Sequence, residues 1–539
     1  MPSTVNSYVF LEKGRFSKPD DTSGSRRNSF AYFEPAFVRP LVALIQDGSS
    51  WALLLLKGRM ELSESSHPKL VVENALILDA ATPDFAPYYG HLVVATDGRI
   101  QKIGQGPAPS YDSVVSRLDA KGQILAPGFV SAHSHLFTSA SRGLGEDQSL
   151  YGWIVAMTRY TDHCDDEDIY YLSKHGAVDF LRNGITTAYD FTSTGVPFQM
   201  EDDGHGTFSQ DNYKPITWEQ AQFKAKLDAG IRFINSVWLA EMQSKEATFA
   251  RLEALVNWSN QFQDHPQFLR MALSGTVQWA EKKETAALEL EAMQRFGLIN
   301  QPHFLETPHN IEGQREKFWW YHEAGALSPD LIFGHFIHAG EEIIQTAARC
   351  GCGAVWQPTS NGRLASGVAD VPCWLKHGMN VGVGLDDQSC TDLSDPFQNM
   401  RIGIYTLRAT HKDPAAMSAR KMLYLHTKGS AETLQIADQV GSLEVGKYAD
   451  FLLVDPQDPD TGPIHDPIST YVLACSLRNL KGVYVGGERR VIDGKVEHLD
   501  ARELSSEVHN RINRIRAKVS PDHPLWTHAT TPVVANANA

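Results

Sequence analysis

Short apolar runs recur through the middle of the chain, and longer stretches with a helical spacing of apolar residues separate them. The first run is Ile124–Val130. Seven further strand-like runs follow it at residues 185–189, 231–235, 269–273, 301–305, 331–335, 354–356 and 381–385. Helical spacing is clearest in residues 167–183 and 341–348. Eight strands that alternate with helices predict an α/β fold, a (β/α)8 TIM-like barrel over residues 124–429, with a doubly wound sheet as the alternative.

Shorter strand patterns with turn signals flank this region on both sides. They are Leu70–Asp79, Gly90–Ile100, 449–454 and 483–487. Asp97-Gly98 has the composition of a two-residue hairpin turn. We expect the two flanks, residues 69–123 and 430–500, to form one small β-sandwich that is built from both chain ends.

The outermost segments differ in composition from the rest of the chain. Ser, Asp, Arg and Gly dominate residues 17–29, so we expect residues 1–68 to form an N-terminal extension that is partly disordered. Residues 503–519 have a helical pattern, and small or polar residues follow them. Residues 501–539 are therefore predicted to be a C-terminal helix and tail.

Composition narrows the functional classes. The chain has 539 residues, of which 42% are hydrophobic and 21% charged, as in soluble globular proteins. A net charge of −15 argues against nucleic-acid binding, and no apolar run is long enough to cross a membrane. The six scattered cysteines do not form the pattern of a secreted disulfide framework, so we expect buried thiols. We predict a cytoplasmic protein that forms a homo-oligomer.

Histidines and carboxylates occur at the ends of several predicted strands. His133 and His135 are two residues apart, so they lie on the same face of the first strand. An isolated pair of this kind is better explained by structural histidines. His303 lies in the fifth strand, His335 ends the sixth, and Asp386 follows the eighth. Because these strand ends meet at one mouth of a barrel, the set indicates a metal site.

Three histidines and one carboxylate can bind one divalent metal ion and leave a position for water. Zinc is the expected ion, with iron as the alternative. Such an ion lowers the pKa of a bound water, which favours hydrolysis. Glu306 lies close enough along the chain to His303 to carry a proton to the leaving group. Phe137, Trp153 and Asn361 are candidate substrate contacts, whereas we interpret His338 as structural.

Several segments together resemble the amidohydrolase superfamily, in its mononuclear branch of aminohydrolases and chlorohydrolases. The segments that carry the resemblance are Pro127–His135, Arg142–Leu144, Leu150–Trp153, His303–Thr307, Gly334–His338, Ser360–Gly367 and Gly441–Asp450. The branch includes cytosine, guanine and S-adenosylhomocysteine deaminases and triazine hydrolases. The absence of lysine from residues 269–276 favours a single metal, because the binuclear branches use a lysine on the fourth strand.

The resemblance also implies a role for each candidate residue. His133, His135, His303 and Asp386 would bind the metal, and Glu306 would shuttle protons. His335 would contact the attacking water or the developing oxyanion. Asp386 would also accept a proton from the water. The small-molecule substrate stays open, because Asp386 is followed by Asp387 and not by the usual neighbours, and because residues 193–217 form a long polar loop that could act as a lid.

These observations predict a metal-dependent hydrolase, and a deaminase of a nitrogen heterocycle in particular. The same site could instead hydrolyse another C–N, amide or C–Cl bond, or assist a decarboxylation. A binding module without activity is the least supported alternative, since no proposed metal ligand is missing from the sequence.

Overall fold

The structure is a computed structural model, and it describes residues 68–111, 115–193, 195, 198–200, 206–208, 213–239, 241–242 and 244–518. The predicted N-terminal extension up to residue 67, residues 194, 196–197, 201–205 and 209–212 of the predicted lid, and the C-terminal tail lie outside the described residues. Within the lid, β8 Phe198–Met200 and β9 Gly206–Phe208 form an antiparallel pair.

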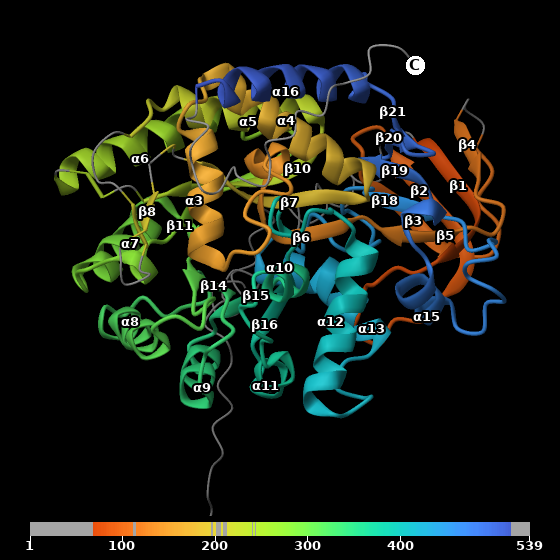
Figure 1. Cartoon of the computed structure of the whole chain (residues 1–539). Helices are drawn as coiled ribbons and strands as arrows, with labels where there is room; N and C mark the ends of the chain where they lie inside the picture. The colour runs from red at the N-terminus through yellow and green to blue at the C-terminus, as the bar shows by residue number, and fades with distance from the viewer. Residues whose placement is uncertain are drawn as a thin grey trace, which may run out of the picture. The chain divides into compact units, whose positions relative to one another are not determined.

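Parallel strands form two sheets at the centre of the described part of the chain (Figure 1). The six-stranded sheet has the order β12-β11-β10-β7-β6-β17, with β12 Ile299–Asn300, β11 Phe268–Ser274, β10 Arg232–Trp238, β7 Ile185–Phe191, β6 Phe129–His135 and β17 Asp386–Asp387. The four-stranded sheet runs β13 His303–Phe304, β14 Ile332–His335, β15 Gly353–Trp356 and β16 Asn380–Val383. All neighbours within each sheet are parallel.

The predicted strand at 124–130 divides at Gly128 into β5 Ile124–Pro127, which pairs with strands of the flanking segments, and β6. Two further predicted strands are interrupted, and the two parallel sheets meet at these two interruptions. Gln301 and Pro302 separate β12 from β13. The N–H of Gln301 donates to Leu273 of β11, whereas the carbonyl of Pro302 accepts from Gly334 of β14. The strand therefore changes its partner at a proline, which has no N–H to donate.

The second interruption separates β16 from β17 at Gly384 and Leu385. The N–H of Gly384 donates to Trp356 of β15, and β17 then pairs with β6. The parallel strands thus have a TIM-barrel-like arrangement, although the described residues are paired as two sheets and not as one closed ring.

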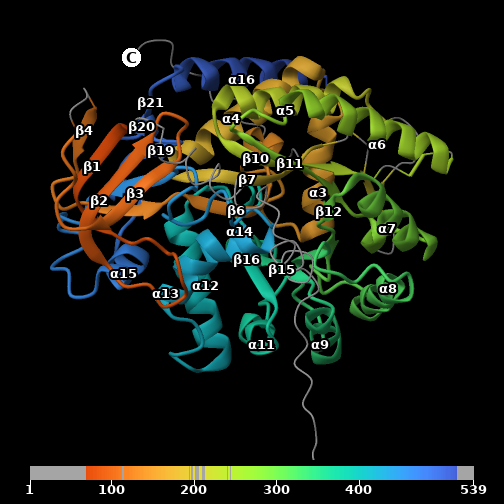
Figure 2. The ribbon, with the colours of Figure 1, turned by 180° about the vertical axis from the view of Figure 1, so that it is seen from behind.

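Helices surround the parallel strands in both views (Figures 1 and 2). They are α3 Leu150–Thr161, α4 Asp166–Arg182, α5 Thr217–Ala229, α6 Lys245–Ser259, α7 Glu284–Phe296, α8 Ile311–Glu323, α9 Glu341–Arg349, α10 Pro358–Arg363, α11 Val371–Lys376, α12 Pro396–His411, α13 Ala419–Tyr424, α14 Ser430–Thr433, α15 Pro467–Ser469 and α16 Ala501–Arg516. The predicted helices at 167–183 and 341–348 are α4 and α9. The predicted C-terminal helix begins at Ala501, because the carboxylate of Asp500 accepts hydrogen bonds from the first turn.

The segments that flank the parallel strands form one nine-stranded sheet. Its strands are β1 Pro68–Ile77, β2 Tyr88–Ala95, β3 Ile100–Gln105, β4 Ser116–Asp119, β5 Ile124–Pro127, β18 Phe451–Val454, β19 Leu480–Val485, β20 Glu488–Ile492 and β21 Lys495–Val496. Strand β18 pairs antiparallel with β5, so the two chain ends contribute to the same sheet. A sandwich of two separate sheets is not confirmed, because all nine strands are linked by pairing.

Alternate residues of this sheet pack in opposite directions. Leu452 and Val454 belong to the large core around the parallel strands, whereas Phe451 and Leu453 pack with Val72 in a separate core. The buried ion pair between Arg232 of β10 and Asp450 also joins the two regions, with 2.6 Å between Nε and Oδ2.

The predicted two-residue hairpin at Asp97-Gly98 is wrong by one residue. Ala95 and Arg99 close the turn through the N–H of Ala95, so the loop contains Thr96, Asp97 and Gly98. Gly98 has φ +82°, the left-handed conformation that a three-residue hairpin loop requires at its last position.

The structure also bears on the expected free cysteines and on the search for membrane-spanning helices. All six cysteines are free, and four of them are buried. Among the described residues, no helix has the length and apolar character needed to span a membrane.

Candidate active site

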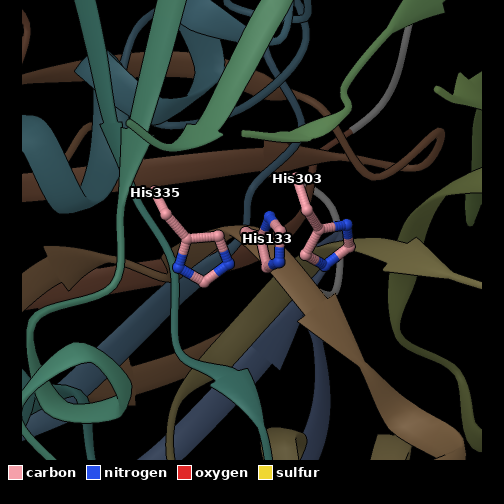
Figure 3. Close-up of side chains that lie close together, drawn as sticks. All are labelled: His133, His303 and His335. Carbon is pink, nitrogen blue, oxygen red and sulfur yellow. The ribbon is translucent and has the colours of Figure 1, made fainter. Parts of the chain in front are cut away.

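The histidines at the strand ends converge on one point. His133 and His135 end β6, and His303 lies in β13 of the other sheet. The Nε2 atom of His135 is 3.1 Å from Nε2 of His303 and 3.3 Å from Nε2 of His133. Figure 3 shows the rings of His133, His303 and His335 facing one another. Imidazole nitrogens this close, turned toward each other, offer their lone pairs to one cation.

Asp386 adds a carboxylate to this group. Its Oδ1 atom is 3.5 Å from Nε2 of His133 and 3.7 Å from Nε2 of His135. Strand β17 positions it, because Asp386 pairs directly with Ser134 between the two histidines. The sequence-predicted set of three histidines and one aspartate is therefore together, and its donor atoms suit zinc or a similar divalent ion.

Gln301 fixes the ring orientation of His133. The Nδ1–H of His133 donates to Oε1 of Gln301 at 2.6 Å, and Nε2 of Gln301 donates to the carbonyl of Ala132 at 3.0 Å. Because Nδ1 carries the proton, Nε2 of His133 keeps its lone pair and faces the other histidines. A second hydrogen-bonded group that selects the tautomer in this way is typical of metal-binding histidines.

His335 is held in the opposite tautomer. Asn361 donates from Nδ2 to Nδ1 of His335 at 2.9 Å, so the proton of the neutral ring is on Nε2. That N–H points toward two carboxylates, with 3.5 Å to Oε2 of Glu306 and 3.9 Å to Oδ2 of Asp386. In this tautomer His335 is placed to donate a hydrogen bond from Nε2, although ring nitrogens of His133, His303 and His335 also lie within 4.8 Å of one another and could hold an ion.

Burial sets the protonation of these groups. Desolvation lowers the pKa of His133 and of His303 to about 3, and it lowers the pKa of His135 and His335 well below 6.5. The rings are thus neutral at physiological pH. Desolvation also raises the pKa of Glu306 well above its usual range, and the nearby charge of Asp386 raises it further.

The backbone is strained at three of these strand ends. Leu305, His335 and Asp386 have φ values of +53°, +64° and +61°, in the left-handed region that side chains disfavour. Such residues persist where surrounding contacts hold them, and they cluster at functional sites. Gly384 is required by a close approach, since an added Cβ would lie 2.7 Å from Cβ of His133.

A cavity of about 830 Å³, counted with its part open to solvent, lies over the histidines. Its apolar walls are Phe137, Leu150, Trp153, Ile154, Met157, Phe191, Trp238 and Trp279. Its polar lining is His135, Thr161, Thr192, Ser193, Ser274, His303, Glu306, His335, Asp386, Asp387 and Cys390, with the backbone of Gly195.

The three predicted substrate contacts have different positions. Phe137 and Trp153 line the cavity. Asn361 does not line it and instead contacts His335 from behind. His338, interpreted as structural, donates from Nε2 to the carbonyl of Ser366 over 2.8 Å and is also outside the lining.

Sequence reasoning did not assign a role to several polar residues of the site, and two of them contact the histidines. Asp387 is buried in the cavity, with Oδ2 3.7 Å from Nε2 of His135. Its position directly after Asp386 was the available signal. Gln301 was missed because a glutamine has no metal-binding signature. Gln301 lies two residues before His303, and in a continuous strand that spacing would place both side chains on the same face. The strand is interrupted at Gln301 and Pro302, so the spacing alone does not predict a shared face.

The sequence matches a known protein family and several curated relatives. The sequence model of the amidohydrolase family matches residues 124–490. A 5'-deoxyadenosine deaminase of Methanosarcina mazei is 24% identical over 458 residues, which are 84% of this chain and 99% of the relative. A 5-methylthioadenosine/S-adenosylhomocysteine deaminase of Bacillus cereus is 27% identical over 431 residues, 78% of this chain and 93% of the relative.

Solved structures share the fold. An adenosine deaminase from Xanthomonas campestris with bound zinc has a TM-score of 0.72 at 21% identity, over 83% of this chain and 99% of that one. The atrazine chlorohydrolase of Arthrobacter aurescens, also in complex with zinc, has a TM-score of 0.69 at 19% identity, over 82% of this chain and all of that one. These similarities imply a TIM-barrel-like fold for this chain.

Proposed function

The chain belongs to the amidohydrolase family, and from that premise we propose that it is a metal-dependent hydrolytic deaminase of a nitrogen heterocycle of the adenosine type. The observation that carries the proposal is the convergence of His133, His135 and His303, with their Nε2 atoms 3.1 and 3.3 Å apart, beside the carboxylate of Asp386. The names of the curated relatives support the choice of an amino-substituted heterocycle as substrate.

The same four residues would hold one divalent ion, with zinc preferred over iron. Zinc is supported by the donor set of three imidazoles and one carboxylate and by the zinc in two structural relatives. When bound, the ion supplies a Lewis acid that makes water acidic enough to react near neutral pH. The tautomer of His133 favours this arrangement, because Gln301 leaves its Nε2 unprotonated.

The remaining polar groups would move protons and stabilise charge. Glu306 is buried with a raised pKa, so it can carry a proton at its Oε2 atom and deliver it to a departing amine. His335 would donate its Nε2–H to an oxygen that develops negative charge on the substrate. Asp386, whose Oδ2 atom is 3.9 Å from that Nε2, is the second group placed to accept a proton from the attacking water.

We further propose that the two parallel sheets act as one closed (β/α)8 barrel over residues 124–429. The backbone hydrogen bonds across Gln301–Pro302 and at Gly384 support this closure. The nine-stranded sheet, with one face packed on the barrel and the other around Val72, would be the composite domain of residues 69–123 and 430–500, extended by β5 from the start of the barrel segment. A homo-oligomeric state and a cytoplasmic location stay predictions.

Two substitutions test the proposed function. His303→Ala removes a metal ligand, so metal and activity should be lost together. Glu306→Gln keeps the shape of the side chain but cannot transfer a proton, so metal should remain while turnover falls by about 10²- to 10⁴-fold. The measurements are metal content by elemental analysis and ammonia release from adenosine-type substrates.

The result for Glu306→Gln also separates the main alternative. Full metal content with nearly normal turnover would remove Glu306 from the mechanism. It would favour a reaction whose leaving group needs no proton, such as the chloride displacement named for one structural relative.

A further inference from the structure

One helix supplies a continuous apolar wall to the cavity. Leu150, Trp153, Ile154, Met157 and Thr161 of α3 all line it, at the spacing of one helix face. Four of these five side chains are apolar. The part of the cavity that α3 covers therefore suits an apolar group and not a hydrated one.

The walls near the histidines are aromatic and partly stacked. The rings of Trp238 and Trp279 lie 5.4 Å apart at an angle of 23°, and the rings of His135 and Phe191 lie 4.7 Å apart at 15°. Flat rings pack well against such faces. The aromatic walls thus favour a planar ligand next to the proposed metal site.

The cavity lining contains acidic side chains and no strongly basic ones. Among the described lining residues, the carboxylic side chains are those of Glu306, Asp386 and Asp387, and there is no lysine or arginine. Lys214 is the described basic side chain packed behind Gly195 of the lining, and its ammonium is already engaged by the carbonyl of Cys164 and the ring of Trp218. Against the described lining residues, an acidic group on a ligand would therefore be buried without a basic side chain to pair with it, which is costly.

Neutral hydrogen-bond donors are present in the cavity instead. The hydroxyl of Ser274 and the indole N–H of Trp153 are buried, and neither has a hydrogen-bond partner among the described residues. Both groups can donate to a neutral acceptor such as a ring nitrogen, an ether or an amide carbonyl. They provide polarity without the full charge that an anion needs.

From these walls we infer the substrate class: a flat heterocycle that carries no acidic group, with an apolar or neutral substituent along α3. The inference rests on the deaminase function proposed above and narrows it, because it excludes substrates that bear a carboxylate or a phosphate. Discrimination between a neutral substituent and an acidic one of the same shape should reach about 30-fold or more, since the acid must be buried unpaired.

The test uses two ligands that differ only in this charge, adenosine 5'-carboxamide and adenosine 5'-carboxylic acid, with the full-length, zinc-loaded protein. Ammonia release gives kcat/KM for each, and calorimetry gives Kd if neither is turned over. Free acetate, present in every sample, controls for direct binding of a carboxylate to the metal ion. A preference of about 30-fold for the carboxamide is expected.

Two substitutions of Met157 in the α3 wall provide matched variants, one that adds a positive charge and one that does not. Met157→Lys places a cation on the cavity face of α3, so it should reduce the preference for the carboxamide at least about tenfold. Met157→Leu keeps the wall neutral and should preserve the preference. If the lysine variant does not fold, the ratio measured with the unaltered protein decides the question alone.

The outcomes separate the two proposals. Equal or stronger binding of the carboxylic acid, or no binding of the carboxamide at all, overturns the inferred substrate class. Selective binding of the carboxamide without ammonia release supports the substrate class and rejects the deaminase function. Ammonia release from both compounds at similar kcat/KM supports the deaminase function and overturns the inferred substrate class.

Discussion

Gln301 allows a direct test of how the site orients its histidines. The substitution Gln301→Leu keeps the volume of the side chain close to that of glutamine but removes both polar atoms. His133 then loses the acceptor that now lies 2.6 Å from its Nδ1 atom, and the carbonyl of Ala132 loses its donor. The ring is free to turn or to move its proton to Nε2, where a proton blocks metal binding.

The expected loss can be stated for metal affinity and for stability separately. Removing a hydrogen-bond partner from a metal-binding histidine typically weakens metal affinity by about 10- to 100-fold. That range corresponds to about 1.4 to 2.8 kcal/mol of binding free energy. The two unsatisfied buried groups should also lower the free energy of unfolding by about 1–3 kcal/mol each.

A matched control separates these two effects. Gln222 is also buried and makes three hydrogen bonds. It accepts from the N–H of Ser193 and donates to the carbonyl of Ser193, each over 2.8 Å, and it donates to the carbonyl of Trp218 over 3.2 Å. Gln222→Leu should therefore lower stability to a similar extent and leave metal affinity unchanged. Gln301→Glu keeps an acceptor for Nδ1–H of His133 and should retain most of the affinity.

The assay is a zinc titration against a chromophoric chelator, with thermal unfolding measured on the same samples of all variants. The reasoning predicts a weaker zinc affinity for Gln301→Leu only. Unchanged zinc affinity in a folded Gln301→Leu protein would refute the idea that this hydrogen bond prepares His133 for the ion.

Three further predictions concern metal content, the C-terminal helix and acid stability. Elemental analysis should find about one divalent ion per chain, and two tightly held ions, or none in an active sample, would contradict a single site. Asp168→Asn should lower the free energy of unfolding by about 3 kcal/mol in denaturant titrations, because Asp168 is buried and pairs with Arg511 and Arg514 of α16. Glu167→Gln, which alters an exposed partner of the same Arg511, should change it little. Burial lowers the pKa of His426 from 6.5 to about 4, so the unfolded chain takes up a proton that the folded chain refuses, and stability should fall by about 3 kcal/mol as pH drops from 6.5 to 4. His426→Gln should flatten that part of the pH profile, and an unchanged slope would be inconsistent with this assignment.

The sequence was informative where chemistry and strand pattern coincide. His133, His135 and Asp386 follow strongly apolar runs, and the alternation of strands and helices placed their ends at one mouth. Parallel strands that alternate with helices all point the same way, so residues far apart in the chain could be grouped without knowledge of any contact.

Local pattern could not reveal the features that depend on neighbouring strands. The left-handed conformation of His335, with φ +64°, and the exchange of partners at Pro302 are set by tertiary contacts. The pairing of β5 with β18 joins both chain ends into one sheet, and nothing within either segment specifies that edge. Trp279, which follows β11 in a short 3-10 helix, reached the cavity through a loop that carries no periodic signal.

The division of the parallel strands into two sheets has a mechanical consequence. His133, His135 and Asp386 belong to the six-stranded sheet, and His303 belongs to the four-stranded one. An ion bound by all four would act as a cross-link that spans the junction between the sheets. Its binding free energy would then resist separation of the two halves, so chelation should loosen amide hydrogens along both junctions before it affects the rest of the fold.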